Sequence, residues 1–289
     1  MQDASLTLEG KSFVVTGGAL GIGGAISDAA AAAGARVLVV DRDAGAGAAR
    51  VDRITAAGGT AVFLQADLAT HAGCRAAVAQ AVAAFGTVDV LCNNVGIQPP
   101  ASYQTAEDTT EEMWDQIMAV NVKSYFLTAK YAIPHMRSRG GGAIINIASV
   151  QGLQSAPLVP AYAASKGAAL SLTRQMAIDY ARENIRVLAV CPGSIDTPLL
   201  RAAVAMEGGD LEQSVHDVGL GHPLGRTGQP EEIASVVVFL AGSGASFMTG
   251  EYVCVDGGYN ALGAWAQPRD PGAATAGAAA ADAATAGDA

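Results

Sequence analysis

Two residues four positions apart, Tyr162 and Lys166, have side chains that could perform acid–base chemistry. On a helix, residues at this spacing lie on one face and close together. An unperturbed tyrosine has a pKa of about 10, so a phenolate that acts as a base near neutrality needs a cation beside it. The spacing therefore predicts a tyrosine base supported by the lysine ammonium, although an isolated match is more often an ordinary surface pair.

Ser149 and Asn121 are candidates to complete such a site. Ser149 ends an apolar segment, 143–148, and ligands of parallel sheets bind at the carboxyl ends of strands. Its hydroxyl could donate to a carbonyl oxygen that gains charge during a reaction, while the plainer alternative is a turn cap. Asn121 lies inside the predicted helix 109–138, where an asparagine more often faces solvent. A functional water held at Asn121 would explain a modest helix former at this position.

A glycine-rich turn follows the first predicted strand, with Gly17, Gly21 and Gly23 leading into a helix. Glycines at such a turn let the backbone approach a pyrophosphate, and the N–H groups of the helix N-terminus bind its negative charge. The pattern alone is weak evidence, and a helix cap with tight packing is the alternative. Its place directly after the first strand favours dinucleotide binding.

Asp41 ends the next predicted strand, 18 residues beyond Gly23. An acidic side chain at this place accepts hydrogen bonds from the adenosine ribose hydroxyls and repels a 2′-phosphate. Leu20 offers no cation for such a phosphate, although the neighbouring Arg42 could partly do so. NAD is therefore predicted in preference to NADP, with a helix N-cap as the alternative role of Asp41.

These candidates require an alternation of strands and helices to bring them together. Short β-branched runs predict strands at 12–16, 36–40, 60–66, 88–93, 143–148, 185–190 and 251–255. Longer segments predict helices at 21–33, 45–57, 70–85, 109–138, 160–182 and 229–241. The strands are apolar on both faces, so helices must cover both sides. The pattern predicts an α/β fold with a doubly wound parallel sheet of about seven strands.

Two segments break this alternation. Residues 194–228 are too long for an ordinary connection, and we expect them to form a substrate lid. Residues 263–289 are rich in alanine and are predicted to form a disordered tail that is dispensable for the chemistry. We therefore expect one dinucleotide-binding domain over residues 1–262.

Composition excludes several classes of protein. Lysine plus arginine number 17 and aspartate plus glutamate 27, giving a net charge of −10, which disfavours nucleic acid and anionic membrane surfaces. The 4 cysteines and 4 histidines show no zinc-ligand spacing, so no metal is expected. The N-terminus resembles no signal peptide and no apolar run is long enough to span a bilayer. We expect a soluble, cytoplasmic protein.

Taken together, the motifs resemble those of the short-chain dehydrogenase/reductase family over about residues 8–262. The matching motifs are TGGALGIG at 16–23, Asp41, Asp67-Leu68, Asn93-Asn94-Val95-Gly96, Asn121, Ser149, YAASK at 162–166, Pro192-Gly193 and Thr197. Val95 departs from the commonest NNAG form of this family, and we expect only a small packing adjustment. The resemblance implies an extended Rossmann fold with strand order 3-2-1-4-5-6-7.

The resemblance also implies roles for matching residues. Tyr162 would be the acid/base, Ser149 would hold the substrate oxygen, Lys166 would lower the tyrosine pKa and bind the nicotinamide ribose, and Asn121 would position a water in a proton relay. The implied cofactor contacts are Gly17, Leu20, Gly21, Ile22, Gly23, Asp41, Asp67, Leu68, Asn94, Gly96, Tyr162, Lys166, Pro192, Gly193, Ile195 and Thr197.

The substrate pocket is expected from residues 96–108, 150–160 and the lid. Its expected side chains are Leu153, Leu158, Leu199, Leu200 and Met206, with the neutral polar Gln98, Gln151 and Gln154. Gln151 is the predicted substrate contact beside Ser149 and Tyr162. No lysine or arginine lies in 140–160, although Arg201 and Arg226 in the lid leave room for an acidic substrate.

Three functions fit this sequence. The first is NAD-dependent interconversion of a secondary alcohol and its ketone, with sugars, cyclic diols and small hydroxyketones as fitting substrates. The second is a 3-oxoacyl-(acyl-carrier-protein) reductase, which the negative charge disfavours because carrier proteins are acidic. The third is a non-catalytic dinucleotide-binding protein on the same fold. The family resemblance also implies a homotetramer, or a homodimer.

Overall fold

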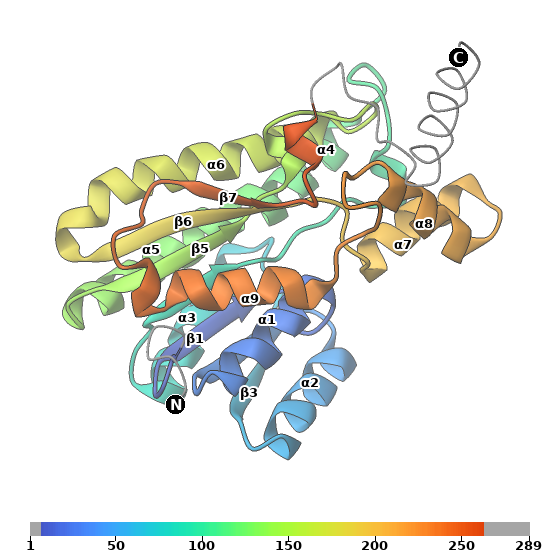
Figure 1. Cartoon of the computed structure of the whole chain (residues 1–289). Helices are drawn as coiled ribbons and strands as arrows, with labels where there is room; N and C mark the ends of the chain where they lie inside the picture. The colour runs from blue at the N-terminus through green and yellow to red at the C-terminus, as the bar shows by residue number, and fades with distance from the viewer. Residues whose placement is uncertain (1–6, 263–289) are drawn as a thin grey trace, which may run out of the picture.

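The computed structural model describes residues 7–262. It contains a seven-stranded sheet that lies between two layers of helices (Figure 1). The strands are β1 (Ser12–Thr16), β2 (Arg36–Asp41), β3 (Thr60–Gln65), β4 (Val90–Asn93), β5 (Gly142–Ile147), β6 (Ile185–Pro192) and β7 (Tyr252–Val255). They are parallel and lie in the order β3-β2-β1-β4-β5-β6-β7. The predicted sheet and strand order are confirmed, and the predicted tail at 263–289 lies outside the described residues.

The helices follow the predicted segments closely, except in two places. They are α1 (Gly21–Ala32), α2 (Ala44–Ala56), α3 (His71–Phe85), α4 (Glu111–Met118), α5 (Ser124–Ser138), α6 (Pro160–Tyr180), α7 (Pro198–Val204), α8 (Leu211–Leu220) and α9 (Pro230–Ala241). The long segment 194–228 contains α7 and α8, which the sequence did not predict as helices. The predicted helix 109–138 contains a π-helical turn between α4 and α5.

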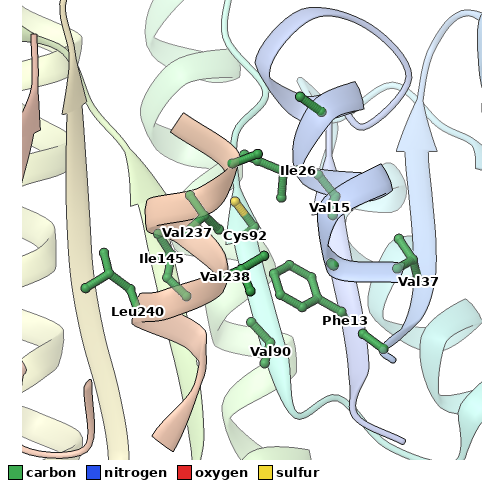
Figure 2. Close-up of a cluster of buried hydrophobic side chains, with 14 of the residues drawn as sticks. Phe13, Val15, Ile26, Val37, Val90, Cys92, Ile145, Val237, Val238 and Leu240 are labelled. Carbon is green, nitrogen blue, oxygen red and sulfur yellow. The ribbon is translucent and has the colours of Figure 1, made fainter. Parts of the chain in front are cut away.

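Helices α1 and α9 pack against each other over one face of the sheet (Figure 1). Figure 2 shows Ile26 from α1 and Val237 from α9 directed toward Phe13 and Cys92 on the strands, and all four side chains are fully buried. Burial of one such large apolar side chain stabilises the fold by about 1.5–3 kcal/mol. The apolar faces of the strands are thus explained on this side of the sheet.

The opposite face of the sheet is covered by α3, α5 and α6. Leu127 and Met136 of α5 join Leu91 and Ile144 of the strands in a second buried cluster. Strands that are apolar on both faces therefore have helices on both faces, as the sequence predicts. The loops that leave the carboxyl ends of the strands remain available to build a site.

A π-helical segment, Ala119–Lys123, lies within the predicted helix 109–138, between α4 and α5. Such segments occur mostly as single turns and frequently at functional sites. Asn121 lies at its centre and is fully buried, with its amide hydrogen-bonded to the backbone of Ile97. The backbone stays helical from Glu111 to Ser138, so the predicted helix is confirmed, and the sequence did not predict the π-helical turn within it.

Candidate active site

A cavity of about 530 Å³ lies at the carboxyl ends of the strands. It is lined both by the glycine-rich turn after β1 and by Ser149, Tyr162 and Lys166. The other predicted site residues that line it are Gly17, Leu20, Gly21, Ile22, Gly23, Asp41, Asp67, Leu68, Asn94, Gly96, Gln151, Pro192, Gly193, Ile195 and Thr197. The fold therefore brings together every predicted site residue except Asn121, which does not line the cavity.

The turn after β1 is so tight that it requires glycine. Gly17 has a φ of +61° and Gly21 a φ of +52°, in the left-handed region that favours glycine. A Cβ on Gly23 would lie 2.0 Å from the carbonyl oxygen of Gly17. The amide of Asn94 also donates to the carbonyl oxygens of Thr16 and Gly17, at 2.9 and 3.0 Å. These contacts fix the turn against the end of β4.

The loop after β6 approaches the same turn. A Cβ on Gly21 would lie 3.4 Å from the side chain of Thr197. Thr197 caps α7, because its Oγ1 accepts from the Leu200 N–H and donates to the Ile195 carbonyl, both at 3.2 Å. The two loops thus adjoin each other in the cavity wall, where Thr197 is also the cap of α7.

Helix α1 begins without a side-chain cap, since its N-cap residue is Leu20. The first N–H groups of a helix have no intrahelical partner, and they attract anions. The neighbouring helices α2 and α3 are capped by Asp43 and Thr70. This difference, together with the glycine turn, fits the pyrophosphate of a dinucleotide.

The Asp41 carboxylate lies at the end of β2 and lines the cavity. Its two oxygens accept hydrogen bonds from the backbone of Ala19 at 3.2 Å and of Asp43 at 3.1 Å. Asp43 caps α2, so the alternative role of Asp41 as a helix cap does not apply. Each carboxylate oxygen keeps acceptor capacity for a ribose hydroxyl. Arg42 also lines this part of the cavity.

Tyr162 and Lys166 lie on one face of α6, as their spacing predicts. The Nζ of Lys166 lies 5.6 Å from the centroid of the Tyr162 ring, and only 3% of the lysine is exposed. The same Nζ donates to the carbonyl oxygen of Ile147 at 2.8 Å, and the Tyr125 hydroxyl donates to that oxygen at 3.0 Å. The end of β5 therefore holds the lysine in place.

Burial shifts the pKa of both Tyr162 and Lys166. It raises the pKa of Tyr162 to about 12, and a charge on Tyr103 raises it further, while the hydrogen bond with Ser149 lowers it. Burial lowers the pKa of Lys166 to about 8, so its ammonium form still predominates at neutral pH. Burial is the largest influence on the pKa of Tyr162, and the role of Lys166 toward the tyrosine stays a prediction.

Ser149 joins the end of β5 to the tyrosine. Its Oγ accepts from the Gln151 N–H at 3.1 Å, so the serine is both a local turn cap and a partner of Tyr162. Nine per cent of Ser149 is exposed, and it lines the cavity. The serine and the phenol can therefore contact one oxygen atom of a bound molecule.

Asn121 lies behind Gly96, outside the cavity wall. Its Oδ1 accepts from the Ile97 N–H at 2.8 Å, and its Nδ2 donates to the Ile97 carbonyl and to Ser165 Oγ, both at 3.1 Å. A Cβ on Gly96 would contact both Lys166 Nζ and Asn121 Oδ1, at 3.4 and 3.7 Å. The asparagine is therefore a neighbour of the lysine and does not face solvent.

Tyr103 is a wall residue that the sequence did not single out. It is half-buried, lines the cavity and acts on the pKa of Tyr162. Burial raises the pKa of Tyr103 itself. The only signal in the sequence was its position within 96–108, the range expected to contribute to the pocket.

A buried polar network beneath the site was also missed. Asn93 Nδ2 donates to Asn146 Oδ1 at 2.9 Å, and Asn146 Nδ2 donates to Thr173 Oγ1 at 2.9 Å. Thr128 donates to Asn93 Oδ1 at 2.7 Å. The network joins β4 and β5 to α5 and α6, and no spacing in the sequence shows that these residues meet.

The wall of the substrate region differs in part from the prediction. Leu199, Leu200, Gln98 and Gln151 line the cavity. The remaining residues predicted for the pocket do not line it and are exposed: Leu153, Leu158, Met206 and Gln154. The sequence marked the correct loops but could not show which side of each loop faces inward.

Arg201 and Arg226, which could have answered an acidic substrate, are engaged in ion pairs. Arg201 binds Asp196 at 2.6 Å and also pairs with Glu212, while Arg226 binds Glu232 at 2.8 Å. The pairing lowers the pKa of both Asp196 and Glu232, the latter to about 2. Neither arginine lines the cavity.

Two further observations concern residues 7–262. No helix in this range is long and apolar enough to cross a membrane. The same range holds no group of three or more His, Cys, Asp or Glu side chains placed to bind a metal ion.

The chain is similar to several known proteins. A family model described as enoyl-(acyl carrier protein) reductase matches residues 17–260. The chain is 39% identical to 2-(S)-hydroxypropyl-CoM dehydrogenase 3 of Xanthobacter autotrophicus, covering 88% of this chain and 98% of the relative. It is 41% identical to 2,5-dichloro-2,5-cyclohexadiene-1,4-diol dehydrogenase of Sphingobium indicum, covering 88% and 99%. A crystal structure of levodione reductase superposes with a TM-score of 0.84 and 30% identity, covering 88% and 99%.

Proposed function

The chain belongs to the short-chain dehydrogenase/reductase family, and from this premise we propose that it is an NAD-dependent oxidoreductase that interconverts a secondary alcohol and its ketone. The observation that carries the proposal is the single cavity lined by the glycine turn and by Ser149, Tyr162 and Lys166. A dinucleotide and a small alcohol can meet there, beside a tyrosine base. Sugars, cyclic diols and other small hydroxy compounds are the substrate class.

The side chains of the cavity have separate roles in the proposed reaction. Bound nicotinamide supplies a hydride acceptor or donor and, when oxidised, a positive charge beside the tyrosine. Tyr162 takes the hydroxyl proton of the alcohol as a phenolate and returns it to the ketone as a phenol. Ser149 hydrogen-bonds the same substrate oxygen and lowers the pKa of Tyr162. This division explains why serine and tyrosine lie within hydrogen-bond distance.

Lys166 and Asn121 support the tyrosine. The Lys166 ammonium lies against the Tyr162 ring and is held by the Ile147 carbonyl, so it can bind a ribose hydroxyl without moving. Asn121 fixes the loop at Ile97 next to Gly96, and a water near it would carry protons between the lysine and solvent. Asn121 thus acts as a positioning residue in the proposed mechanism.

The cofactor preference follows from Asp41. Its carboxylate faces the cavity two residues before the cap of α2, where it would accept hydrogen bonds from the ribose and repel a 2′-phosphate. The remaining cofactor contacts are those predicted from the sequence, and all of them line the same cavity. Arg42 is the side chain that opposes this preference.

The substrate is proposed to be neutral. Of the lysines and arginines in the described residues, Arg42 and Lys166 line the cavity, and both belong to its cofactor-binding part. The lid arginines are bound to acidic partners instead. We retain 194–228 as a substrate lid, since Leu199 and Leu200 of α7 line the cavity and Arg201 ties α7 to α8.

An acyl-carrier-protein reductase is the alternative that the description of the matching family model favours. The net charge of −10 opposes the docking of an acidic carrier protein. A non-catalytic dinucleotide-binding protein is opposed by the common position of Ser149, Tyr162 and Lys166. A cytoplasmic location and a homotetramer belong to the proposal too. Exposed apolar side chains such as Ile178 and Phe247 support the tetramer.

The proposal is tested with a panel of secondary alcohols, sugars and diols, using NAD or NADP and following absorbance of the reduced cofactor. Turnover of neutral secondary alcohols with NAD, at a kcat/KM above that with NADP, is the expected result. Turnover only of acyl thioesters with NADPH would support the carrier-protein alternative. Binding of NAD without turnover of any panel member would support a non-catalytic protein.

A further inference from the structure

Two glutamine side chains in the cavity wall have polar atoms without a partner. Gln98 follows β4 and Gln151 follows β5, and both line the cavity. The Nε2 atom of Gln98 and the Oε1 atom of Gln151 are buried, and neither has a hydrogen-bond partner among the described residues. Gln98 is 9% exposed as a whole residue, so water reaches little of it.

An unpartnered buried polar atom costs free energy, and native proteins contain few of them. Apolar side chains would fill these two positions without that cost. Such an atom in a binding cavity is therefore explained when a bound molecule supplies the missing partner.

The two glutamines are attached to the catalytic groups through the backbone. The Gln151 N–H donates to Ser149 Oγ at 3.1 Å. Gln98 directly follows Ile97, whose N–H and carbonyl are both bound by Asn121, at 2.8 and 3.1 Å. Gln151 is thus tied to the serine that would hold the reacting hydroxyl, and Gln98 follows the residue that Asn121 fixes in place.

The unpartnered atoms differ in hydrogen-bonding character. Gln98 Nε2 is a donor and Gln151 Oε1 is an acceptor. A hydroxyl group both accepts and donates, so it can satisfy both atoms. A carboxylate or phosphate would leave the acceptor unpartnered, and an ammonium group would leave the donor unpartnered.

We propose that Gln98 and Gln151 form a subsite for a second hydroxyl group of the substrate, so that the enzyme acts on diols and other polyols in preference to simple alcohols. The subsite rests on the proposed dehydrogenase function, and it specifies the substrate class. Binding of the second hydroxyl orients the carbon skeleton, and the reacting hydroxyl is thereby presented to Ser149 and Tyr162. Discrimination is strong because a simple alcohol leaves both amide atoms unpartnered.

The test compares matched pairs of substrates, cyclohexanol with trans-cyclohexane-1,2-diol and 2-butanol with butane-2,3-diol, using NAD. The kcat/KM of the wild-type enzyme is expected to be at least about tenfold higher for each diol than for its partner. Gln98→Met and Gln151→Met keep the length of the side chain but remove the amide. Each is expected to reduce the diol-to-alcohol ratio by about tenfold or more.

Gln154→Met is the matched control, since Gln154 lies on the same loop as Gln151 but is exposed and does not line the cavity. It should leave the ratio unchanged. A ratio that stays at the wild-type value in both Gln98→Met and Gln151→Met overturns the subsite. Equal kcat/KM for diols and simple alcohols in the wild-type enzyme does so as well, while the dehydrogenase function stands.

A second measurement does not depend on turnover. Removing an unpartnered buried amide should raise the Tm of Gln98→Met by about 2–4 °C in the absence of substrate. A fall in Tm would show that the amide is used within the folded chain and would overturn the subsite. If the wild-type enzyme turns over no alcohol or diol, the proposed function has failed and the subsite fails with it, whereas turnover without a preference for diols overturns the subsite alone.

Discussion

The glycine-rich turn after β1 and the substrate loops after β4 and β5 build the two ends of one cavity in different ways. At the glycine turn, the wall is mostly backbone, and a single added Cβ on Gly23 would lie 2.0 Å from a carbonyl oxygen. At the substrate loops, the wall is made of side chains such as Gln98, Tyr103 and Gln151. Two of these retain unpartnered polar atoms.

This difference shows what each end selects. A backbone wall with glycines fits one invariant group, the pyrophosphate that dinucleotides share. A side-chain wall can be changed one residue at a time, so it determines which alcohol is accepted. Ser149, Tyr162 and Lys166 lie where the two ends meet, and their chemistry serves any substrate that the second end admits.

The largest effect at the glycine-rich turn is expected from Gly23→Ala. The new Cβ would overlap the Gly17 carbonyl, so we expect NAD affinity to fall by at least about 100-fold, because the turn must open. Calorimetric titration with NAD measures this change. Gly45→Ala in α2 is the control, since its Cβ would meet only Asp43 Oδ1, at 3.6 Å.

A Gly23→Ala variant that binds NAD with wild-type affinity would contradict the idea that the backbone of this turn is the pyrophosphate site. Unfolding of the variant would be detected by its Tm. In that case Gly21→Ala, which places a strained φ of +52° opposite Thr197, tests the same turn with a smaller disturbance.

The pH dependence of kcat/KM tests Tyr162 and Lys166, which lie between the glycine turn and the substrate loops. Burial raises the pKa of Tyr162 to about 12, so the phenolate is the minor form at neutral pH and increases about tenfold per pH unit. We therefore expect kcat/KM for alcohol oxidation to rise between pH 6 and about pH 8. Above that pH the rise should weaken, because Lys166, with a pKa of about 8, loses its charge.

Ketone reduction is the control for this profile. It uses the protonated phenol, the major form across the same range, so its rate should not rise with pH. Parallel pH profiles in the two directions would contradict the assignment of Tyr162 as the acid/base.

A smaller change at the backbone end is expected from Asp41→Ala. Loss of the carboxylate removes the repulsion of a 2′-phosphate, so the ratio of kcat/KM with NAD to that with NADP should fall by about tenfold. Asp210→Ala is the matched control, since it removes the cap of α8, does not line the cavity and should lower stability by about 1 kcal/mol without changing the ratio. An unchanged ratio in Asp41→Ala would remove Asp41 from the cofactor site.

The smallest effect is expected from the lid. Arg201→Met breaks the ion pair with Asp196 and the ion pair with Glu212, the second of which joins α7 to α8. Partly exposed ion pairs contribute little, so a rise in KM for the alcohol of about two- to fivefold is expected, with the NAD-to-NADP ratio unchanged. Steady-state kinetics with each cofactor distinguishes a lid from a residue of the cofactor site.

Much of the fold and of the cofactor end could be predicted from the sequence. The strands are apolar on both faces and alternate with helices, so the parallel sheet follows from local patterns. The glycine turn and Asp41 could be found because each lies at a fixed distance from a strand end. Tyr162 and Lys166 could be paired because helical spacing places them on one face.

The substrate end could not be predicted to the same depth. Tyr103 and Gln98 lie on an irregular loop, where no period shows which side chain faces inward. Gln154 and Gln151 are three residues apart on one loop, yet only Gln151 lines the cavity. The inward position of Asn121 could not be predicted either, since its hydrogen bonds to Ile97 join segments 24 residues apart in the sequence.

The central claim is that hydride passes from a secondary alcohol to NAD while Tyr162 removes the hydroxyl proton. It is tested most directly with a diol deuterated at the carbinol carbons, by measuring the mass of the reduced cofactor. We predict deuterated NADH from the wild-type enzyme, and label transfer slower by about 10³-fold from Tyr162→Phe with NAD affinity retained. Unlabelled NADH from the wild-type enzyme, or label transfer at the wild-type rate by Tyr162→Phe, would contradict the account.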